Sequence, residues 1–339
     1  MMIAKFNTES LAKQTMHGTP TEEPQPIVNI SIPKIENEVP KTSPDEFSDA
    51  IRITGLKQIF NENTGKKTIY DRFPILKKVI GNYQKKEYRL FDNFDFVVPN
   101  FPGTGQIVSI MGGSGCGKSY LLRIIAGLNT PQAGDIRIYG KTQKEYGHVP
   151  MVFQQYSSYD WMTALDNVAL PMVMKQGMSW KDARKAAEKI LCDFGLCEHM
   201  DKYAKPGVLS GGQLQRISVA RCIASDPRLL LLDEATGALD IRMKREVQDM
   251  LLNLFYAKGT DITILNVTHS VEEALYLSNR VIVLKAKPCT IYKTIDVHYP
   301  GESETNRRGK WIFNTQEYVN YSRELTATLD EACFEQKTN

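Results

Sequence analysis

Four short, continuous apolar runs divide the central part of the chain. They cover residues 106–110, 229–232, 262–267 and 280–284. Runs of this length predict strands that are buried on both faces, which is typical of a parallel sheet.

Between these runs, apolar residues recur at helical spacing. The spacing predicts a helix from about Lys118 and further helices over 180–191, about 242–257 and 271–277. Strands that alternate with helices predict an α/β domain with a mainly parallel sheet and helices on both faces.

Two more strand patterns precede this region, at residues 51–60 and 89–98. From residue 62 to 89 the chain carries eight Lys or Arg against three acidic residues. We interpret about 61–88 as a solvated, basic surface insertion. A patch for anionic lipid or for a partner is the alternative.

The remaining segments differ in character. Residues 1–50 contain six prolines and more acidic than basic residues, which predicts a disordered or loosely packed tail. Residues of about 155–225 lack any strand pattern and are interpreted as a helical insertion, and residues 301–339 as a C-terminal extension.

Composition narrows the function classes. A net charge of +3 indicates no polyanion as the main partner, and 42% apolar residues suffice for a core. Six scattered cysteines without metal-ligand spacing suit a reducing compartment better than a disulfide framework. The N-terminus shows no leader pattern, and no apolar run approaches the ~20 residues that span a bilayer. If the protein works at a membrane, we expect another chain to supply the spanning part.

A glycine-rich loop follows the first buried run and fits the phosphate-binding pattern G-x-x-x-x-G-K-[ST] in full. Glycines let backbone N–H groups turn toward phosphate oxygens, and the following helix N-terminus adds positive partial charge. We expect Lys118 to reach the β- and γ-phosphates of a nucleotide and Ser119 to hold Mg²⁺. The loop consists of Gly112, Gly113, Ser114, Gly115, Cys116, Gly117, Lys118 and Ser119.

Three further polar sites lie at the end of a predicted strand or the start of a predicted helix. Asp233 and Glu234 end a run of four leucines, so we expect Asp233 to bind Mg²⁺ and Glu234 to act as the general base. His269 follows the strand at 262–267 and should open onto the same crevice. Ser210 can cap a helix that begins with exposed glycine N–H groups.

These motifs together resemble the ATPase subunit of ABC transporters over roughly 51–300. The resemblance rests on the phosphate loop, Leu-Ser-Gly-Gly-Gln at 209–213, the acidic strand end, Ala-Leu-Asp at 238–240 and His269. Within that family, the segments at 213–216, 233–240, 267–277 and 280–288 are similar to the nitrate/sulfonate/taurine importer branch. The resemblance implies a P-loop NTPase fold with an antiparallel β subdomain and a helical insertion subdomain.

The resemblance also implies individual roles. His269 is the switch histidine for the γ-phosphate, and Gln154 reaches Mg²⁺ and the attacking water, with Gln155 the weaker candidate. Phe60 or Tyr70 stacks on the adenine, although a core role for Phe60 is equally consistent. Tyr120 stands where the family has a small residue and is expected to crowd the base pocket. Gly237 stands where the family often has Ser.

The implied assembly is a head-to-tail dimer that sandwiches two ATP molecules. Ser210, Gly211, Gly212 and Gln213 of one copy would face the γ-phosphate bound by the other, and Asp240 would help to link the two sites. We therefore expect an ATP-hydrolysing importer subunit for a small anion such as nitrate, sulfonate or taurine. It would lie peripherally at the cytoplasmic face of the inner membrane, bound to a permease and served indirectly by a solute-binding protein.

The sequence leaves two rival functions open. One is a soluble ABC-type ATPase that acts on nucleic acid or ribosomes; the single ATPase unit and the small basic surplus count against it, so we expect no nucleic-acid partner. The other is a nucleotide-binding regulator without turnover, which Glu234 and His269 oppose.

Two side chains carry sharper expectations. Trp161 begins the helical insertion and either lines the groove for a permease helix or belongs to the core of that insertion. Cys116 lies among phosphate-binding amides, and we expect this positive environment to raise its thiolate fraction.

Overall fold

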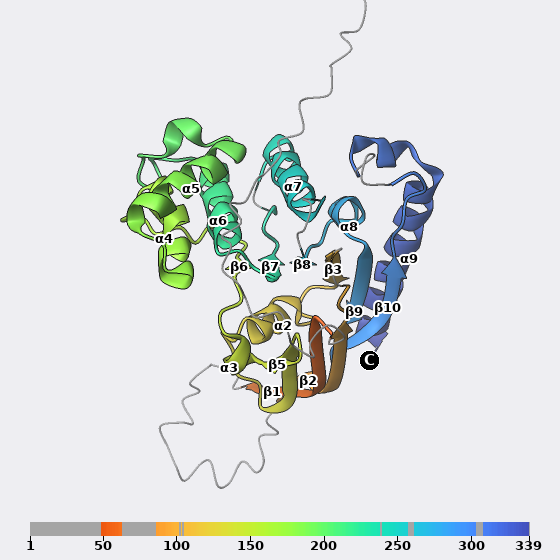
Figure 1. Ribbon diagram of the computed structural model, residues 1–339. Coiled ribbons are helices and arrows are strands. Elements are labelled where there is room, and N and C mark those ends of the chain that lie inside the picture. Colours follow the sequence, from red (N-terminus) through yellow and green to blue (C-terminus); the bar gives the residue numbers. More distant parts are fainter. Residues whose placement is uncertain are drawn as a thin grey trace, which may run out of the picture.

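Two β-sheets and a set of helices form the computed structural model (Figure 1). The structure describes residues 49–338 apart from 63–85, 102, 104, 238, 257–260 and 303–307. The expected tail up to residue 48, most of the basic insertion and Tyr70 therefore lie outside the described residues.

The larger sheet has six strands in the order β10-β9-β3-β8-β7-β6. All neighbours are parallel except β10 and β9, which pair antiparallel. The strands are β3 (Gln106–Gly112), β6 (Met151–Val152), β7 (Leu229–Asp233), β8 (Thr263–Val267), β9 (Arg280–Lys285) and β10 (Thr290–Asp296). The mainly parallel sheet expected from the sequence is confirmed.

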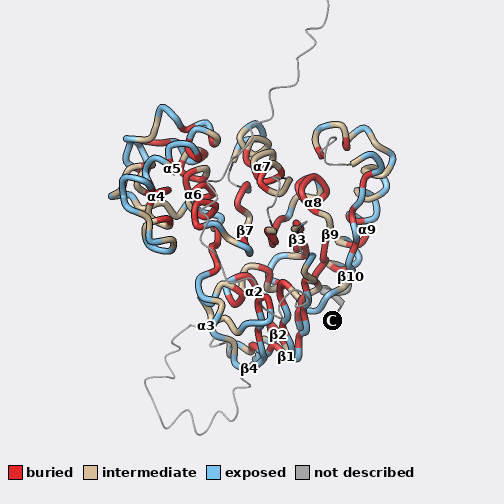
Figure 2. Tube along the Cα trace, in the orientation of Figure 1, coloured by how far each residue is buried: buried red, intermediate tan, exposed pale blue. Residues whose placement is uncertain are grey.

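Successive residues of the central strands enter two different hydrophobic cores. Leu230 and Leu232 of β7 face one core, whereas Leu229 and Leu231 face the other. This alternation follows from the two-residue period of a strand, and it explains why these runs are continuously apolar. Figure 2 shows buried residues along the strands of the larger sheet and over most of α6 and α8.

The smaller sheet is antiparallel, in the order β2-β1-β4-β5. Its strands are β1 (Ile51–Glu62), β2 (Lys86–Val98), β4 (Ala133–Ile138) and β5 (Lys141–Thr142). Helix α2 (Lys118–Ile125) shares a core with this sheet, and α3 (Gln143–Tyr146) follows β5. The antiparallel subdomain implied by the family resemblance is confirmed.

Strands β1 and β2 extend further than the sequence pattern predicts. Phe60 pairs with Tyr88 and Glu62 with Lys86, so both ends of the segment expected as an insertion belong to strands. Backbone hydrogen bonds between these two strands extend both of them beyond their apolar residues.

The helical insertion consists of α4 (Ala164–Gln176), α5 (Trp180–Asp193), the short 3₁₀ helix η3 (Cys197–His199) and α6 (Gly211–Ala224). Thr163, Ser179 and Ser210 cap the three α-helices, each accepting a backbone N–H three residues on. Such caps satisfy donors that have no partner within the helix. Figure 1 shows these helices to one side of the larger sheet, near β6 and β7.

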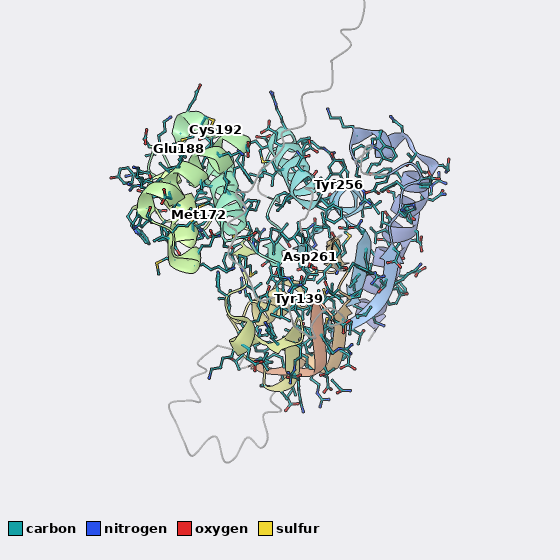
Figure 3. All side chains as sticks on the ribbon, viewed as in Figure 1. Tyr139, Met172, Glu188, Cys192, Tyr256 and Asp261 are labelled. Carbon is teal, nitrogen blue, oxygen red and sulfur yellow. A yellow bond between two sulfur atoms is a disulfide. The ribbon has the colours of Figure 1, made fainter. Side chains whose placement is uncertain are left out.

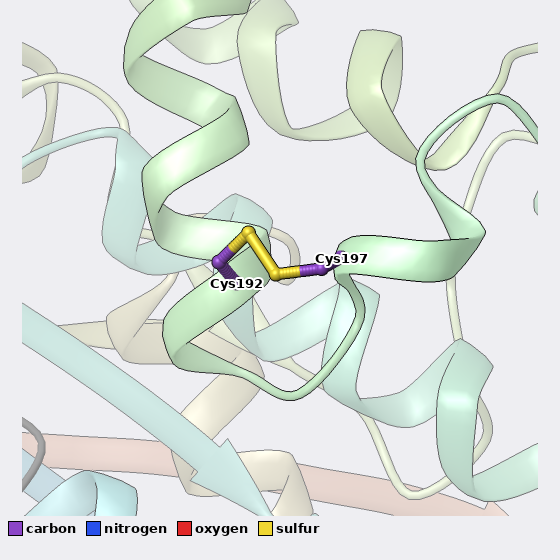
Figure 4. The surroundings of a disulfide bond; sticks show 2 residues. All are labelled: Cys192 and Cys197. Atoms are coloured by element: carbon purple, nitrogen blue, oxygen red, sulfur yellow. A yellow bond between two sulfur atoms is a disulfide. The ribbon is translucent and has the colours of Figure 1, made fainter.

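One pair of cysteines corrects the expectation from composition. Cys192 at the end of α5 and Cys197 form a disulfide (Figure 4), with Cα atoms 4.4 Å apart. Gly195 lies between them with a φ of 65°, a left-handed conformation that suits glycine and turns the chain back on itself. Local turn geometry, which cysteine spacing alone does not reveal, brings the two residues together.

The C-terminal segment packs against the larger sheet. Helices α7 (Ile241–Tyr256) and α8 (Val271–Leu277) cover the central strands, and α9 (Gln316–Thr338) follows the 3₁₀ helix η4 (Lys310–Asn314). Figure 1 shows α9 beside β9 and β10, and Leu325 and Ala332 are fully buried there. The described part of the extension therefore belongs to the core.

Tyr139 connects the two sheets (Figure 3). Its hydroxyl donates to the backbone oxygen of Arg228 at 2.9 Å, and the Arg228 guanidinium lies 4.1 Å above its ring. Arg228 also pairs with Asp261 at 3.3 Å, so the base of β7 and the start of β8 are joined to the antiparallel sheet.

None of the helices in the described part of the chain combines the length and the apolar character needed to span a bilayer.

Candidate active site

Four adjacent parallel strands end at the same edge of the larger sheet. Their order β3-β8-β7-β6 places four loops side by side. The phosphate loop follows β3, His269 follows β8, Glu234 follows β7 and Gln154 follows β6. Ligands of open α/β sheets bind at this carboxyl edge.

The phosphate loop curls around the Lys118 ammonium group. Lys118 Nζ donates to the backbone oxygens of Gly112 at 2.8 Å and Gly113 at 3.0 Å, and the residue is 5% exposed. Gly112 has a φ of 149°, and a Cβ there would lie 2.3 Å from the backbone oxygen of Leu284. Only glycine fits this position, because the loop runs directly against β9.

A hydroxyl and a carboxylate meet beside this loop. Ser119 Oγ donates to Asp233 Oδ1 at 2.7 Å. Burial raises the pKa of the Asp233 carboxyl, and the hydrogen bond from Ser119 and the charge of Arg123 offset this only in part. The pair offers two oxygen atoms at the opening of the phosphate loop.

Glu234 and His269 form the next contact along the edge. His269 Nε2 lies 2.5 Å from Glu234 Oε1, and the two side chains are 51% and 21% exposed. Glu234 has a φ of 49°, which is uncommon for a residue other than glycine. Its backbone N–H donates to Val267 O at 2.9 Å, which holds the turn after β7 against the end of β8. Backbone strain of this kind is concentrated at functional sites.

Gln154 is exposed after the short strand β6. A second glutamine, Gln215 on α6, is 3% exposed and connects this loop with the acidic one. Its side-chain amide donates to the backbone oxygens of Phe153 at 3.1 Å and Ala235 at 2.7 Å. No role for Gln215 was predicted from the sequence; the available signal was a polar residue on a largely buried helix.

Phe60 and Tyr120 lie together beside the phosphate loop. Their ring centroids are 5.5 Å apart in an edge-to-face arrangement, and Phe60 is 38% exposed. Tyr88 of β2, which the sequence analysis missed, donates its hydroxyl to Gly115 O at 2.8 Å. Tyr120 thus packs against Phe60 and extends the aromatic surface next to the loop.

Residues 210–213 of the Leu-Ser-Gly-Gly-Gln motif, called the signature residues from here on, form hydrogen bonds within the helical insertion. Ser210 and Gln213 form a capping box at the start of α6, and Gln213 Nε2 contacts His199 Nε2 at 2.7 Å. Gly212 packs so closely that a Cβ would lie 2.1 Å from Met243 Sδ. Figure 1 shows α6 and α2 apart, so the signature helix and the phosphate loop belong to different parts of the molecule.

Asp240 caps the start of α7, where its Oδ1 accepts the backbone N–H of Met243 at 2.9 Å. Gly237 donates its N–H to Glu234 O at 2.9 Å, which closes the turn that follows the acidic pair. Both residues therefore lie on the segment that leads away from Glu234.

Cys116 departs from the expectation of a raised thiolate fraction. Burial raises the pKa of its thiol, and the Lys118 charge lowers it by less. The residue is fully buried, since the side of the loop that holds Cys116 faces the core instead of the phosphate-binding side. The expectation of a raised thiolate fraction is wrong.

Comparison with known proteins agrees with this geometry. Residues 102–237 match the ABC transporter family. The chain is 41% identical over 229 residues to the nitrate import ATP-binding protein NrtD of Synechocystis sp. (strain ATCC 27184 / PCC 6803 / Kazusa), an alignment that covers 67% of this chain and 84% of the relative. It is 37% identical over 223 residues to the aliphatic sulfonates import ATP-binding protein SsuB of Bacillus cereus (strain ATCC 10987 / NRS 248). That alignment covers 64% of this chain and 82% of the relative.

Solved structures give the same result. The ATP-binding cassette MJ0796 in a dimeric post-hydrolysis state with ADP and Pi aligns with a TM-score of 0.58 and 27% identity, covering 74% of this chain and 100% of that one. The fold is that of a P-loop NTPase. The chain belongs to the ABC transporter family as an ATP-binding subunit, and it hydrolyses ATP to power a membrane transporter.

The Cys116 environment predicts slow alkylation in the native protein. At pH 8 we expect maleimide to label the half-buried Cys333 much faster than Cys116, measured by mass spectrometry of the two peptides. Because the pKa of Cys116 is raised, its thiolate fraction and its labelling should increase as the pH rises further. Unfolding in guanidinium should equalise the two rates; equal rates in the native protein would contradict the burial argument.

Proposed function

We propose that the chain powers an importer of a small inorganic or organic anion. The catalytic assignment is supported by two side-chain contacts along one sheet edge, Ser119–Asp233 and Glu234–His269. The solute class is supported by the relatives, which are named for the import of nitrate and aliphatic sulfonates and the transport of bicarbonate. All three solutes are anions.

ATP binding follows from the phosphate loop. Lys118 and the loop N–H groups from Gly113 to Ser119 bind the β- and γ-phosphates, and the adenine stacks on Phe60 with Tyr120 behind it. The residues present also suit Mg²⁺, because Ser119 Oγ and Asp233 Oδ1 are hard oxygen donors 2.7 Å apart. A cation there favours the charged form of the buried Asp233 carboxyl. When bound, Mg²⁺ neutralises charge on the phosphate oxygens.

Hydrolysis requires a base and a γ-phosphate contact. Glu234 takes a proton from the attacking water, and His269, held 2.5 Å from it, contacts the γ-phosphate. Gln154 orients the water from the neighbouring loop. The backbone N–H of Glu234 donates to Val267 O, which holds the strained turn after β7 against the end of β8.

A second copy completes each site. Ser210, Gly211, Gly212 and Gln213 lie on the helical insertion, so they reach a γ-phosphate only when another molecule presents them. The dimeric cassettes among the structural neighbours support this arrangement. Asp240 lies on the segment after the catalytic turn and links the two sites.

The permease contact is assigned to the start of the helical insertion. Trp161 is 74% exposed, so the core alternative is wrong. Its ring lies 5.1 Å from that of Tyr159, which in turn lies under the Arg221 guanidinium at 4.6 Å. An exposed tryptophan that packs on a half-buried tyrosine suits a socket for a permease helix. The working position is then the cytoplasmic face of the membrane, with a solute-binding protein on the other side.

Replacing the base tests the catalytic assignment. Glu234→Gln should retain ATP binding and lose hydrolysis, because the amide cannot accept the proton. With ATP, the variant should accumulate as a dimer on gel filtration. Lys118→Ala is the control that should lose both binding and dimerisation; a monomeric Glu234→Gln protein with bound ATP would contradict the sandwich.

Trp161→Ala tests the docking surface. The side chain is exposed, so melting temperature and basal ATPase activity should stay near those of the parent. Permease binding should weaken by about 2 kcal/mol or more, as expected for an anchor residue. Trp180→Ala, a substitution of another partly exposed tryptophan at the start of α5, is the matched control and should bind normally. Equal binding by both variants would place the contact elsewhere.

Reconstitution tests the solute. The chain is co-expressed and co-purified with its membrane partner, and ATPase activity in proteoliposomes is measured with nitrate, alkyl sulfonates, taurine or bicarbonate supplied with the cognate binding protein. We expect one anion to stimulate turnover. Stimulation by a cation or a neutral sugar alone would overturn the solute class, and purification with ribosomes instead of a membrane partner would favour the rival function.

A further inference from the structure

Glu273 is a nearly fully buried carboxylate beside the catalytic loops, with no role in the chemistry described above. It lies on α8 and is 3% exposed. One of its oxygens, Oε2, accepts hydrogen bonds from Thr236 Oγ1 at 2.7 Å and Thr268 Oγ1 at 3.1 Å. Lys244 Nζ on α7 lies 3.1 Å from the same oxygen.

The two threonines belong to the two loops that must cooperate in hydrolysis. Thr236 is two residues after Glu234, inside the turn closed by the hydrogen bond from Gly237 to Glu234. Thr268 immediately precedes His269. Both threonines are buried, so each hydroxyl needs a partner within the protein. The Glu273 carboxylate therefore connects the loop of Glu234 with the loop of His269.

Local sequence alone would give Glu273 a different partner. Ser270 and Glu273 have the S-x-x-E spacing of a capping box, in which the glutamate would accept the Ser270 backbone N–H. Ser270 Oγ does accept the Glu273 N–H at 3.2 Å, but the Ser270 N–H donates to Thr268 Oγ1 at 3.1 Å. The carboxylate is thus available for Thr236, Thr268 and Lys244.

We propose that Glu273 is a positioning residue that sets the separation of Glu234 and His269. The inference rests on the proposed catalytic roles of those two residues. Glu234 stands on a backbone with positive φ, so its carboxylate depends on neighbouring contacts to stay in place. Small displacements of a reacting group lower the reaction rate. A carboxylate bonded to both loops keeps the distance between Glu234 and His269 constant. Lys244 compensates the buried charge.

Thr236 offers a matched pair of substitutions. Thr236→Val keeps the shape and removes the hydroxyl, whereas Thr236→Ser keeps the hydroxyl and removes a methyl group. If the bond to Glu273 positions the loop, the Val variant should lose about tenfold or more in kcat with little change in the KM for ATP. The Ser variant should recover most of that loss. If Thr236 only packs, the Ser variant should be at least as impaired as the Val variant, which would overturn the proposal.

Glu273→Gln provides the second measurement on the full-length protein. We expect a similar loss in kcat with ATP affinity by calorimetry within about twofold of the parent. Adding Thr236→Val should then cause little further loss, because both changes break one interaction. Glu272→Gln is the control, since that neighbour is 58% exposed and pairs with Arg245 on the outer side. Full additivity of the two losses would contradict a shared role.

The outcomes separate this inference from the proposed function. If Glu234→Gln is inactive while Thr236→Val and Glu273→Gln keep the parent kcat, the catalytic assignment stands and the positioning role fails. If Glu234→Gln hydrolyses ATP normally, the proposed base itself is wrong. Should Glu273→Gln fail to fold, the Thr236 pair still decides the matter.

Discussion

The burial of the central sheet on both faces is the constraint on which the site depends. Because β3, β8, β7 and β6 are parallel neighbours, their carboxyl ends meet at one edge. Apolar side chains on alternate faces hold each strand in register between two cores, so the loops begin from fixed positions. The Ser119–Asp233 and Glu234–His269 contacts are possible because the strands that precede these residues cannot slide.

Polar contacts behind the site complete this arrangement. Gln215 joins the ends of β6 and β7 through two backbone oxygens, and Glu273 joins the segments after β7 and β8. Both residues are almost fully buried, and each forms hydrogen bonds with two of the loops at the sheet edge. Interior polar groups of this kind are satisfied by several partners at once, which limits the movement of each loop.

The helical insertion serves a different purpose. Residues 210–213 form hydrogen bonds with one another and with His199, whereas the exposed Trp161 packs on the half-buried Tyr159 in the loop between β6 and α4. Gln154 lies in the same loop as Trp161, between β6 and α4. Gln215 of α6 donates to the backbone oxygen of Ala235, in the loop that follows Glu234. This hydrogen bond connects the helical insertion with the loop that follows Glu234.

Local patterns in the amino-acid sequence were enough to predict the parallel sheet, the phosphate loop and the order of the polar loops, because continuous apolar runs and motif spacing are read within one segment. They also determined the family. The folded structure was needed to show that Cys116 is buried, that Cys192 is bonded to Cys197, that Trp161 is exposed and that Glu273 bonds two loops instead of capping its own helix. Those four outcomes depend on which surfaces pack against each residue. Such contacts join segments that a linear pattern does not relate, and for the cysteine pair they depend on a turn whose geometry the spacing does not show.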